Sequence, residues 1–268
     1  MKTLSGKVAV VTGAGGGIGA AVARRLSAEG MRLALVDLAI APVEELARSL
    51  GRASAHVADV SQASAWERLA REVQRVHGGV DVLVNNAGVT ILGAFDQQSI
   101  ADLDRIVDVN LKGVLYGCRT FLPLLAARGE AHVVNVASLA GRVPFPYQST
   151  YCATKYAVRG FTASLRMELA GRGIGVSAVL PGAVATRLLE TARSYDAPAS
   201  SKLAELMLAH GMPPERVADR VVDAIEGDLA EVLVGWDARV ATFARAVAPR
   251  ALEAALGSAF RWRAGRRS

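Results

Sequence analysis

The feature that most constrains the fold lies near the start of the chain, where glycines separate an apolar, β-branched run from a helical pattern. Residues 7–30 read KVAVVTGAGGGIGAAVARRLSAEG, which predicts a strand, a tight turn and a helix. Such a turn lets the backbone approach a pyrophosphate, whose charge is favoured at a helix N-terminus. The alternative is a glycine-rich connection without a ligand. The flanking strand and helix favour nucleotide binding, through Gly13, Gly17, Ile18 and Gly19.

An acid closes the second predicted strand. Asp37 follows Gly17 by twenty residues, where a dinucleotide-binding fold needs a carboxylate for the adenosine ribose hydroxyls. A 2′-phosphate there would meet a like charge, and the neighbours Val36, Leu38 and Ala39 supply no cation. The sequence therefore predicts NAD rather than NADP. The alternative is an acid that merely ends a strand.

A second acid, Asp59, closes the third predicted strand and is followed by Val60. We expect these two residues to border the adenine, with the carboxylate accepting a hydrogen bond from the adenine amino group. A compatible alternative is that Asp59 caps the N-terminus of a helix starting near Ser61.

Three further residues suit proton transfer to or from a carbonyl or alcohol oxygen. Residues 150–170 predict a helix on which Tyr151 and Lys155 share a face, one turn apart. A neighbouring ammonium favours the phenolate, so we expect Lys155 to lower the pKa of Tyr151. Ser138 would supply a hydroxyl that holds the substrate oxygen. An isolated tyrosine and lysine pair is weak evidence, so this prediction depends on its context.

Strand and helix patterns alternate along the whole chain. This order predicts a parallel sheet covered on both faces, with ligands at the carboxyl ends of its strands. We expect an α/β fold: a Rossmann-type, doubly wound parallel sheet of about seven strands, followed by a C-terminal helical extension. The predicted strands are residues 7–12, 32–37, 53–58, 80–85, 131–137, 174–180 and 230–234.

Five motifs in this order resemble those of the short-chain dehydrogenase/reductase superfamily. The resemblance spans residues 5 to about 235. The motifs are TGxxxGxG at Thr12–Gly19, NNAG at Asn85–Gly88, a helix asparagine at Asn110, PG at Pro181–Gly182, and Thr186 beyond it.

The resemblance implies a role for each candidate catalytic residue. Tyr151 would be the general acid/base, exchanging a proton while hydride moves to or from the nicotinamide. Lys155 would lower the tyrosine pKa and bind the nicotinamide ribose. Ser138 would polarise the carbonyl, and Asn110 would hold the lysine through a water and a proton relay. An alternative for Asn110 is a buried polar residue that kinks its helix.

The resemblance also implies how the remaining motifs hold NAD. The segment from Asn86 to Gly88 would pass the adenosine ribose, whereas Asn85 would brace the sheet. Thr186 would bind the nicotinamide carboxamide. The cofactor contacts implied in these motifs are Asn86, Ala87, Gly88, Tyr151, Lys155, Pro181, Gly182, Val184 and Thr186.

Apolar segments on either side of these motifs should border a substrate cleft. Besides Ser138 and Tyr151, the wall candidates are Leu139, Val143 and Phe145, although each could instead belong to the core. An apolar alcohol or ketone fits such walls. Arg142 and Arg187 are the nearest cations, and a solvated loop is the favoured interpretation for both. Residues 187–212 resemble a lid that orders on binding.

Length and composition favour one catalytic domain, residues 1–235, with residues 236–268 as a basic amphipathic extension that is not an independent domain. The chain has 268 residues, is 51% hydrophobic, and contains two cysteines without a secretory signal. These features predict a cytoplasmic protein. The four histidines are scattered without ligand spacing, so no metal site is expected. The cysteines are expected to be buried rather than redox-active.

The positive charge is concentrated in the extension. Residues 237–268 hold seven arginines against Asp237 and Glu253, a net +5 of the chain's +6. An apolar stripe at helical spacing is formed by Trp236, Val240, Phe243 and Val247, and a second short helix follows Pro249. Three interpretations stay open. The extension packs on another subunit or over the cleft, contacts an anionic membrane as a peripheral protein, or ends as a disordered tail.

Together these features predict an NAD-dependent oxidoreductase that interconverts a secondary alcohol and a ketone. One alternative is a catalytically silent NAD-binding regulatory or structural protein. Another is an epimerase or dehydratase that uses transient oxidation. The partners expected are the alcohol or ketone and, from the resemblance, other copies of the chain in a homodimer or homotetramer. Nucleic acid is not expected, because no binding module surrounds the arginines.

Overall fold

A seven-stranded parallel sheet forms the centre of the molecule. The computed structural model describes residues 1–188, 192–195 and 205–264, of which residues 259–264 are described by their backbone alone. The sheet order is β3-β2-β1-β4-β6-β7-β9, so the chain builds one wing of the sheet from β1 and then returns to build the other. The strands are β1 Val8–Thr12, β2 Arg32–Asp37, β3 Ala53–Val57, β4 Val82–Asn85, β6 Ala131–Val136, β7 Ile174–Pro181 and β9 Glu231–Val234.

All seven predicted strands are confirmed, with ends that differ by at most two residues. The central strands are buried along their whole length, as expected for strands that are covered by helices on both faces. The prediction missed two short strands, β5 (Ile91–Leu92) and β8 (Arg193–Ser194), which pair with each other in a separate sheet. Two residues are too few to produce a recognisable alternation.

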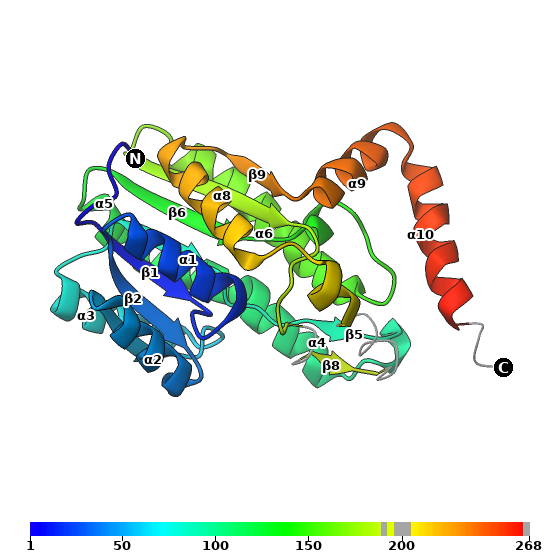
Figure 1. The fold of residues 1–268 in the computed structure, drawn as a ribbon, viewed down its shortest axis with the longest axis horizontal. Helices are drawn as coiled ribbons and strands as arrows, with labels where there is room; N and C mark the ends of the chain where they lie inside the picture. Colours follow the sequence, from blue (N-terminus) through cyan, green and yellow to red (C-terminus); the bar gives the residue numbers. More distant parts are fainter. Residues whose placement is uncertain (189–191, 196–204, 265–268) are drawn as a thin grey trace.

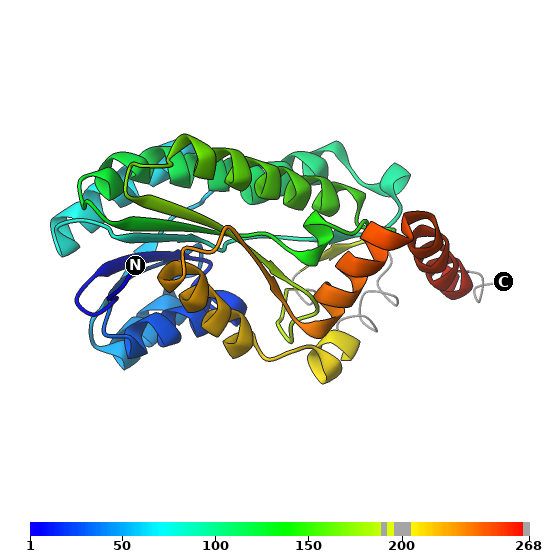
Figure 2. The ribbon, with the colours of Figure 1, turned by 90° about the horizontal axis from the view of Figure 1, so that it is seen from above.

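Helices cover both faces of the sheet, as Figure 2 shows. One core packs α1, α2 and α8 against the sheet, and the other packs α3, α5 and α6. Trp66 and Phe121 are fully buried in the second core, where their rings meet edge to face. The helices of the two layers are α1 Gly17–Ala28, α2 Ile40–Leu50, α3 Ala63–His77, α5 Gly113–Ala126, α6 Ser149–Glu168 and α8 Pro214–Glu226.

The remaining helical segments surround the carboxyl ends of the strands or follow the last strand. α10 extends away from the body of the molecule in Figure 1. Among the described residues, no helix is both long and apolar enough to cross a membrane. These segments are the 3₁₀ turns η1 Phe95–Gln97 and η3 Leu139–Gly141, the π-helical turn η2 Asp108–Lys112, the helices α4 Ile100–Val107, α9 Trp236–Val247 and α10 Pro249–Ala264, and the helical residues 205–210.

Candidate active site

The glycine-rich turn joins β1 to α1 at the carboxyl edge of the sheet. Gly13 and Gly17 have positive φ angles of 66° and 51°. A Cβ on Gly19 would lie 2.0 Å from the carbonyl oxygen of Gly13, so only glycine allows this helix to approach the turn. Gly16 is the N-cap of α1, and no side chain caps the helix. The first-turn N–H groups of α1 can therefore bind an anionic group.

Asp37 faces this turn from the end of β2. Its carboxylate accepts hydrogen bonds from the N–H groups of Gly15 at 2.9 Å and Leu38 at 2.7 Å. A Cβ on Gly15 would come within 2.9 Å of the same carboxylate. The turn thus holds Asp37 beside the uncapped helix end, an arrangement that fits the pyrophosphate and adenosine ribose of a dinucleotide.

Asp59 lies after β3 and forms a local turn. Its carboxylate accepts hydrogen bonds from the Ser61 backbone N–H at 2.9 Å and the Ser61 hydroxyl at 2.7 Å. The prediction that Asp59 caps the next helix is wrong, because α3 begins at Ala63 with Gln62 as its N-cap. Val60 packs its side chain in the core, and its carbonyl accepts the Trp66 indole N–H at 2.9 Å.

Thr12 ties the end of β4 to the glycine-rich turn, a role that the sequence reasoning missed. Its hydroxyl oxygen accepts the N–H groups of Asn86 at 3.0 Å and Ala87 at 3.1 Å. The Asn86 side chain donates in return to the Thr12 carbonyl at 2.9 Å. Asn85 points into the sheet instead and donates to Asn135 at 2.8 Å, as its predicted bracing role requires.

Ser138, Tyr151 and Lys155 come together beyond the end of β6. The Ser138 hydroxyl oxygen accepts the Ala140 N–H at 3.1 Å, so η3 fixes its orientation, and Ser138 is also hydrogen-bonded to Tyr151. Lys155 projects from the next turn of α6, with its Nζ 5.7 Å from the Tyr151 ring centroid. That Nζ donates to the Val136 carbonyl at 3.0 Å. The three predicted residues therefore form one group.

The pKa of Tyr151 is raised rather than lowered in the protein's own groups, which contradicts the prediction made from its neighbour Lys155. Burial raises the pKa of Tyr151 to about 12, although the hydrogen bond to Ser138 acts in the opposite direction. Burial also lowers the pKa of Lys155 to about 8. The Lys155 ammonium donates to the Val136 carbonyl, and desolvation is the largest influence on the pKa of both Tyr151 and Lys155. At neutral pH the phenol is therefore protonated.

Asn110 is fully buried in η2, the π-helical turn between α4 and α5. Its side chain accepts the Val89 N–H and donates to the Val89 carbonyl, both at 2.8 Å, and it also donates to the Thr154 hydroxyl at 3.3 Å. A Cβ on Gly88 would lie 3.3 Å from Asn110 Oδ1 and 3.7 Å from Lys155 Nζ. Asn110 therefore links the NNAG segment to α6, near the lysine.

The loop after β7 reaches the glycine-rich turn. Pro181 ends β7, and Val184 bridges to Met212. Thr186 stands over the glycine-rich turn, because a Cβ on Gly17 would lie 3.2 Å from its Cγ2.

Asp237 in the first turn of α9 holds this loop, a contact that sequence reasoning missed. Its carboxylate accepts the Ala183 N–H at 2.7 Å. A Cβ on Gly182 would lie 2.1 Å from that carboxylate, so the close packing of Asp237 requires a glycine at this position. The sequence around Asp237 gives no sign of this contact, apart from the position of the acid at the start of a helix.

The predicted substrate walls divide into core and cleft. Val143 is fully buried against Ala238 of α9, so the structure contradicts it as a wall residue and supports the core alternative. Leu139 belongs to the same cluster and is 7% exposed. Phe145 is partly buried at the edge of that cluster. Arg142 forms an ion pair with Glu231 and is not the solvated cation that was expected.

A hydrogen-bonded latch holds residues 193–195 of the predicted lid. The Tyr195 hydroxyl donates to the Asp102 carboxylate at 2.6 Å and accepts the Ser99 N–H at 2.8 Å. Arg193 pairs with the same carboxylate at 3.0 Å. Asp102 is 5% exposed, so the acceptor of these contacts is buried, whereas the Arg193 side chain is 69% exposed. Within the predicted lid, residues 189–191 and 196–204 lie outside the described residues, whereas residues 205–210 are helical.

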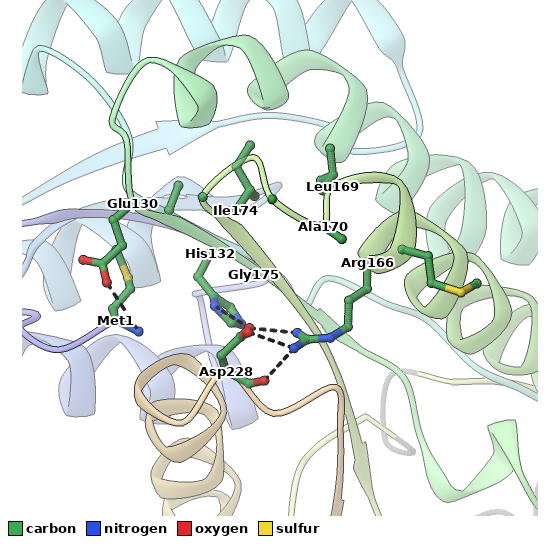
Figure 3. A pocket seen from close by; sticks show the side chains of 13 residues that line it. Met1, Glu130, His132, Arg166, Leu169, Ala170, Ile174, Gly175 and Asp228 are labelled. Atoms are coloured by element: carbon green, nitrogen blue, oxygen red, sulfur yellow. Dashed lines mark hydrogen bonds and ion pairs between the residues drawn. The ribbon is translucent and has the colours of Figure 1, made fainter.

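A cavity of about 550 Å³ lies at the other end of the sheet, near the amino ends of β6 and β7 (Figure 3). Its charged groups are paired, since Arg166 donates to both carboxylate oxygens of Asp228 at 2.8 Å. His132 bonds to Ser177 at 2.8 Å, and burial lowers its pKa to about 4. No predicted site residue lines this cavity, so it is separate from the candidate active site.

The described residues contain no other cluster suited to the predicted chemistry. No group of three or more histidines, cysteines or acids that could hold a metal ion occurs among them. Cys118 and Cys152 are free and buried, as predicted. Burial raises the pKa of Cys118 to about 12, so its thiol is not ionised at neutral pH.

Comparison with known proteins agrees with this geometry. Residues 7–197 match the family described as short chain dehydrogenase. The chain belongs to this family, and it is an oxidoreductase of the short-chain dehydrogenase/reductase type. SadH of Mycobacterium tuberculosis, which is named as an oxidoreductase, is 37% identical over 249 residues that cover 89% of this chain and 90% of SadH.

Solved structures of the same type superpose closely. A short-chain dehydrogenase/reductase from Burkholderia phymatum in complex with NAD has a TM-score of 0.86 and 29% identity, covering 91% of this chain and 94% of its own. A 3-ketoacyl-(acyl-carrier-protein) reductase from Brucella melitensis complexed with NADH has a TM-score of 0.78 and 31% identity, covering 87% and 98% respectively.

Proposed function

We propose that this protein is an NAD-dependent oxidoreductase that interconverts a secondary alcohol and a ketone on an apolar substrate. One observation carries the proposal: Tyr151, hydrogen-bonded to Ser138, lies with Lys155 at the sheet edge that also holds the glycine-rich turn. This arrangement provides an acid and a hydroxyl donor beside a nucleotide site.

The chain's own residues fit NAD. Gly13, Gly17, Ile18 and Gly19 would hold the pyrophosphate at the start of α1, and Asp37 would accept the ribose hydroxyls. A 2′-phosphate would meet the Asp37 carboxylate, while the adjoining Leu38 is apolar and 61% exposed. The two solved relatives carry NAD and NADH, which supports this choice.

The ionisation of Tyr151 suits proton donation to a ketone oxygen. A phenol with a pKa of about 12 is protonated at neutral pH, so it is ready to give its proton as the carbonyl is reduced. Ser138 would orient that carbonyl, and the Lys155 ammonium would stabilise the phenolate that remains. When bound, the nicotinamide supplies or accepts the hydride and carries a positive charge in its oxidised form. Alcohol oxidation needs the phenolate, so its rate rises with pH.

The substrate side of the site favours an apolar ligand. Phe145 lies partly buried beside Leu139, and Phe95 on η1, seven residues after the NNAG segment, is 59% exposed. The Asp102 carboxylate is occupied by Tyr195 and Arg193, and Arg142 is occupied by Glu231. These charged groups are thus unavailable to a polar substrate.

A panel of sterols, medium-chain alcohols and cyclic ketones, followed by the absorbance of reduced nicotinamide, tests this function. Tyr151→Phe should abolish turnover while NAD binding, measured by calorimetry, stays unchanged. Tyr156→Phe on the same helix is the matched control, because its side chain is 38% exposed and should be dispensable. Unaltered turnover in Tyr151→Phe would reject the assigned acid. NAD binding without net NADH formation for any alcohol would reject the dehydrogenase reaction.

A further inference from the structure

The first helix of the C-terminal extension presents its apolar stripe to solvent. Successive members of this α9 stripe are four, three and four residues apart and therefore lie on one side of the helix. The opposite side of α9 holds it to the protein, where Ala238 is fully buried against Leu139 and Val143. The stripe consists of Trp236, Val240, Phe243 and Val247, which are 78%, 47%, 69% and 67% exposed.

Unpaired arginines lie next to the α9 stripe in the sequence. Arg239 is exposed on α9, three residues after Trp236 and four before Phe243, and Arg250 is exposed at the start of α10, three residues beyond Val247; neither pairs with a carboxylate among the described residues. The two acids of the extension are already engaged. Asp237 accepts the Ala183 N–H, and Glu253 pairs with Arg245. The face around the stripe is therefore both apolar and cationic.

We propose that the α9 stripe docks on an anionic membrane surface, with α9 lying in the plane of the lipid headgroups. A helix of 12 residues is about 18 Å long, which is too short to cross a bilayer but suffices for one face to enter the interface. Tryptophan and phenylalanine favour the boundary between headgroups and acyl chains, and arginines bind anionic headgroups. The exposed side of α9 combines both features.

The charge distribution favours lipid over a second copy of this chain. A two-fold symmetric contact through the α9 stripe would bring Arg239 and Arg250 of one protomer towards the same unpaired residues of the other. Like charges placed together oppose association, whereas a bilayer that contains phosphatidylserine complements them. The wider extension adds to this attraction, since residues 237–268 carry a net charge of +5.

Co-sedimentation with phosphatidylcholine vesicles, with and without phosphatidylserine, tests the proposal on the full chain. We expect binding only to the anionic vesicles, weakening as salt is added. Phe243→Ser should reduce the partition coefficient about tenfold, because a buried phenylalanine stabilises the bound state. Ile100→Ser is the matched control, since Ile100 is 72% exposed on α4.

Two double variants, each lacking two arginine charges, separate the electrostatic contribution to vesicle binding from the apolar one. Arg239→Gln/Arg250→Gln should lower binding to anionic vesicles roughly 30-fold, from the usual contribution of a basic residue near such a surface. Arg24→Gln/Arg71→Gln removes the same charge from exposed positions on α1 and α3 and should leave binding nearly unchanged. Equal losses in the two double variants would show that net charge alone acts, and would overturn the docking face.

Fluorescence locates the helix directly. In a Trp262→Phe background, Trp236 should shift to the blue and be quenched by brominated lipid, whereas the buried Trp66 should not respond. Absence of vesicle binding at low salt would overturn the proposal. So would a fall in the sedimentation mass of the lipid-free protein on Phe243→Ser, which would assign the stripe to self-association. These measurements do not depend on catalysis.

Discussion

We expect Lys155 to lower the stability of the folded protein, although the active site requires it. It is 5% exposed, and burial lowers its pKa from 10.5 to about 8. This lowering corresponds to about 3 kcal/mol of unfavourable free energy for the charged form in the folded chain. The hydrogen bond from Nζ to the Val136 carbonyl, which contributes about 1.5 kcal/mol, would be lost on substitution. We therefore expect Lys155→Met to be inactive yet about 1–2 kcal/mol more stable at pH 7.

The stability difference between the wild type and Lys155→Met should depend on pH in a direction set by the Lys155 pKa. Between the folded pKa of about 8 and the ordinary value of 10.5, the unfolded chain binds more protons than the folded one, so wild-type stability from this group rises with pH. The advantage of Lys155→Met is complete below about pH 8 and should narrow as pH rises through this window. Urea unfolding at pH 7 and near pH ~9.5, with fixed protein concentration and no cofactor, measures both quantities.

A lysine on the surface provides the control. Lys112 is exposed and pairs with Asp108 at 2.7 Å, which raises its pKa. Lys112→Met should give no stabilisation at pH 7. If Lys155→Met were less stable than the wild type at pH 7, or if its advantage stayed constant with pH, the assignment of a buried, destabilising ammonium would be refuted.

Three further substitutions test other parts of the site. Asp37→Ala should relax the preference for NAD, measured as the ratio of kcat/KM for the two cofactors, and a wild type that prefers NADP would contradict this assignment. Gly19→Ala should abolish NAD binding in calorimetry, since its Cβ would lie 2.0 Å from a backbone carbonyl oxygen. Gly160→Ala, with no atom within 4 Å of its Cβ, should bind normally, and equal loss in both would refute the packing argument. Tyr195→Phe removes the bond to Asp102 and should speed limited proteolysis near residue 195 about tenfold, whereas unchanged cleavage would exclude a latch.

The strands and the gathering of Ser138, Tyr151 and Lys155 were predictable because their signals are local. A parallel strand covered on both faces is apolar throughout, and residues four apart on a helix share a face. Both rules need only a few neighbouring residues. The resemblance to a known family then supplied roles that spacing alone does not give.

The features that could not be predicted from the sequence depend on contacts between segments that are far apart in the chain. Periodicity showed that α9 is amphipathic but not which side faces inward, and the small Ala238 packs against the protein while Phe243 is exposed. Apolar character likewise could not separate the buried Val143 from a cleft wall. The bond of Asp237 to Ala183 spans 54 residues and leaves no trace in local sequence. The pKa of Tyr151 depends on burial, which follows from the completed fold.

The order of strands in the sheet bears on how the chain folds during its synthesis. β2 is laid against β1, β3 against β2, β4 against β1, β6 against β4, β7 against β6 and β9 against β7. Each strand therefore emerges from the ribosome after the neighbour on which it docks. One wing is complete by residue 57, and the other then grows outward by one strand at a time. At every stage of the second wing a single strand edge awaits its partner, which limits the time for which unpaired backbone is open to aggregation.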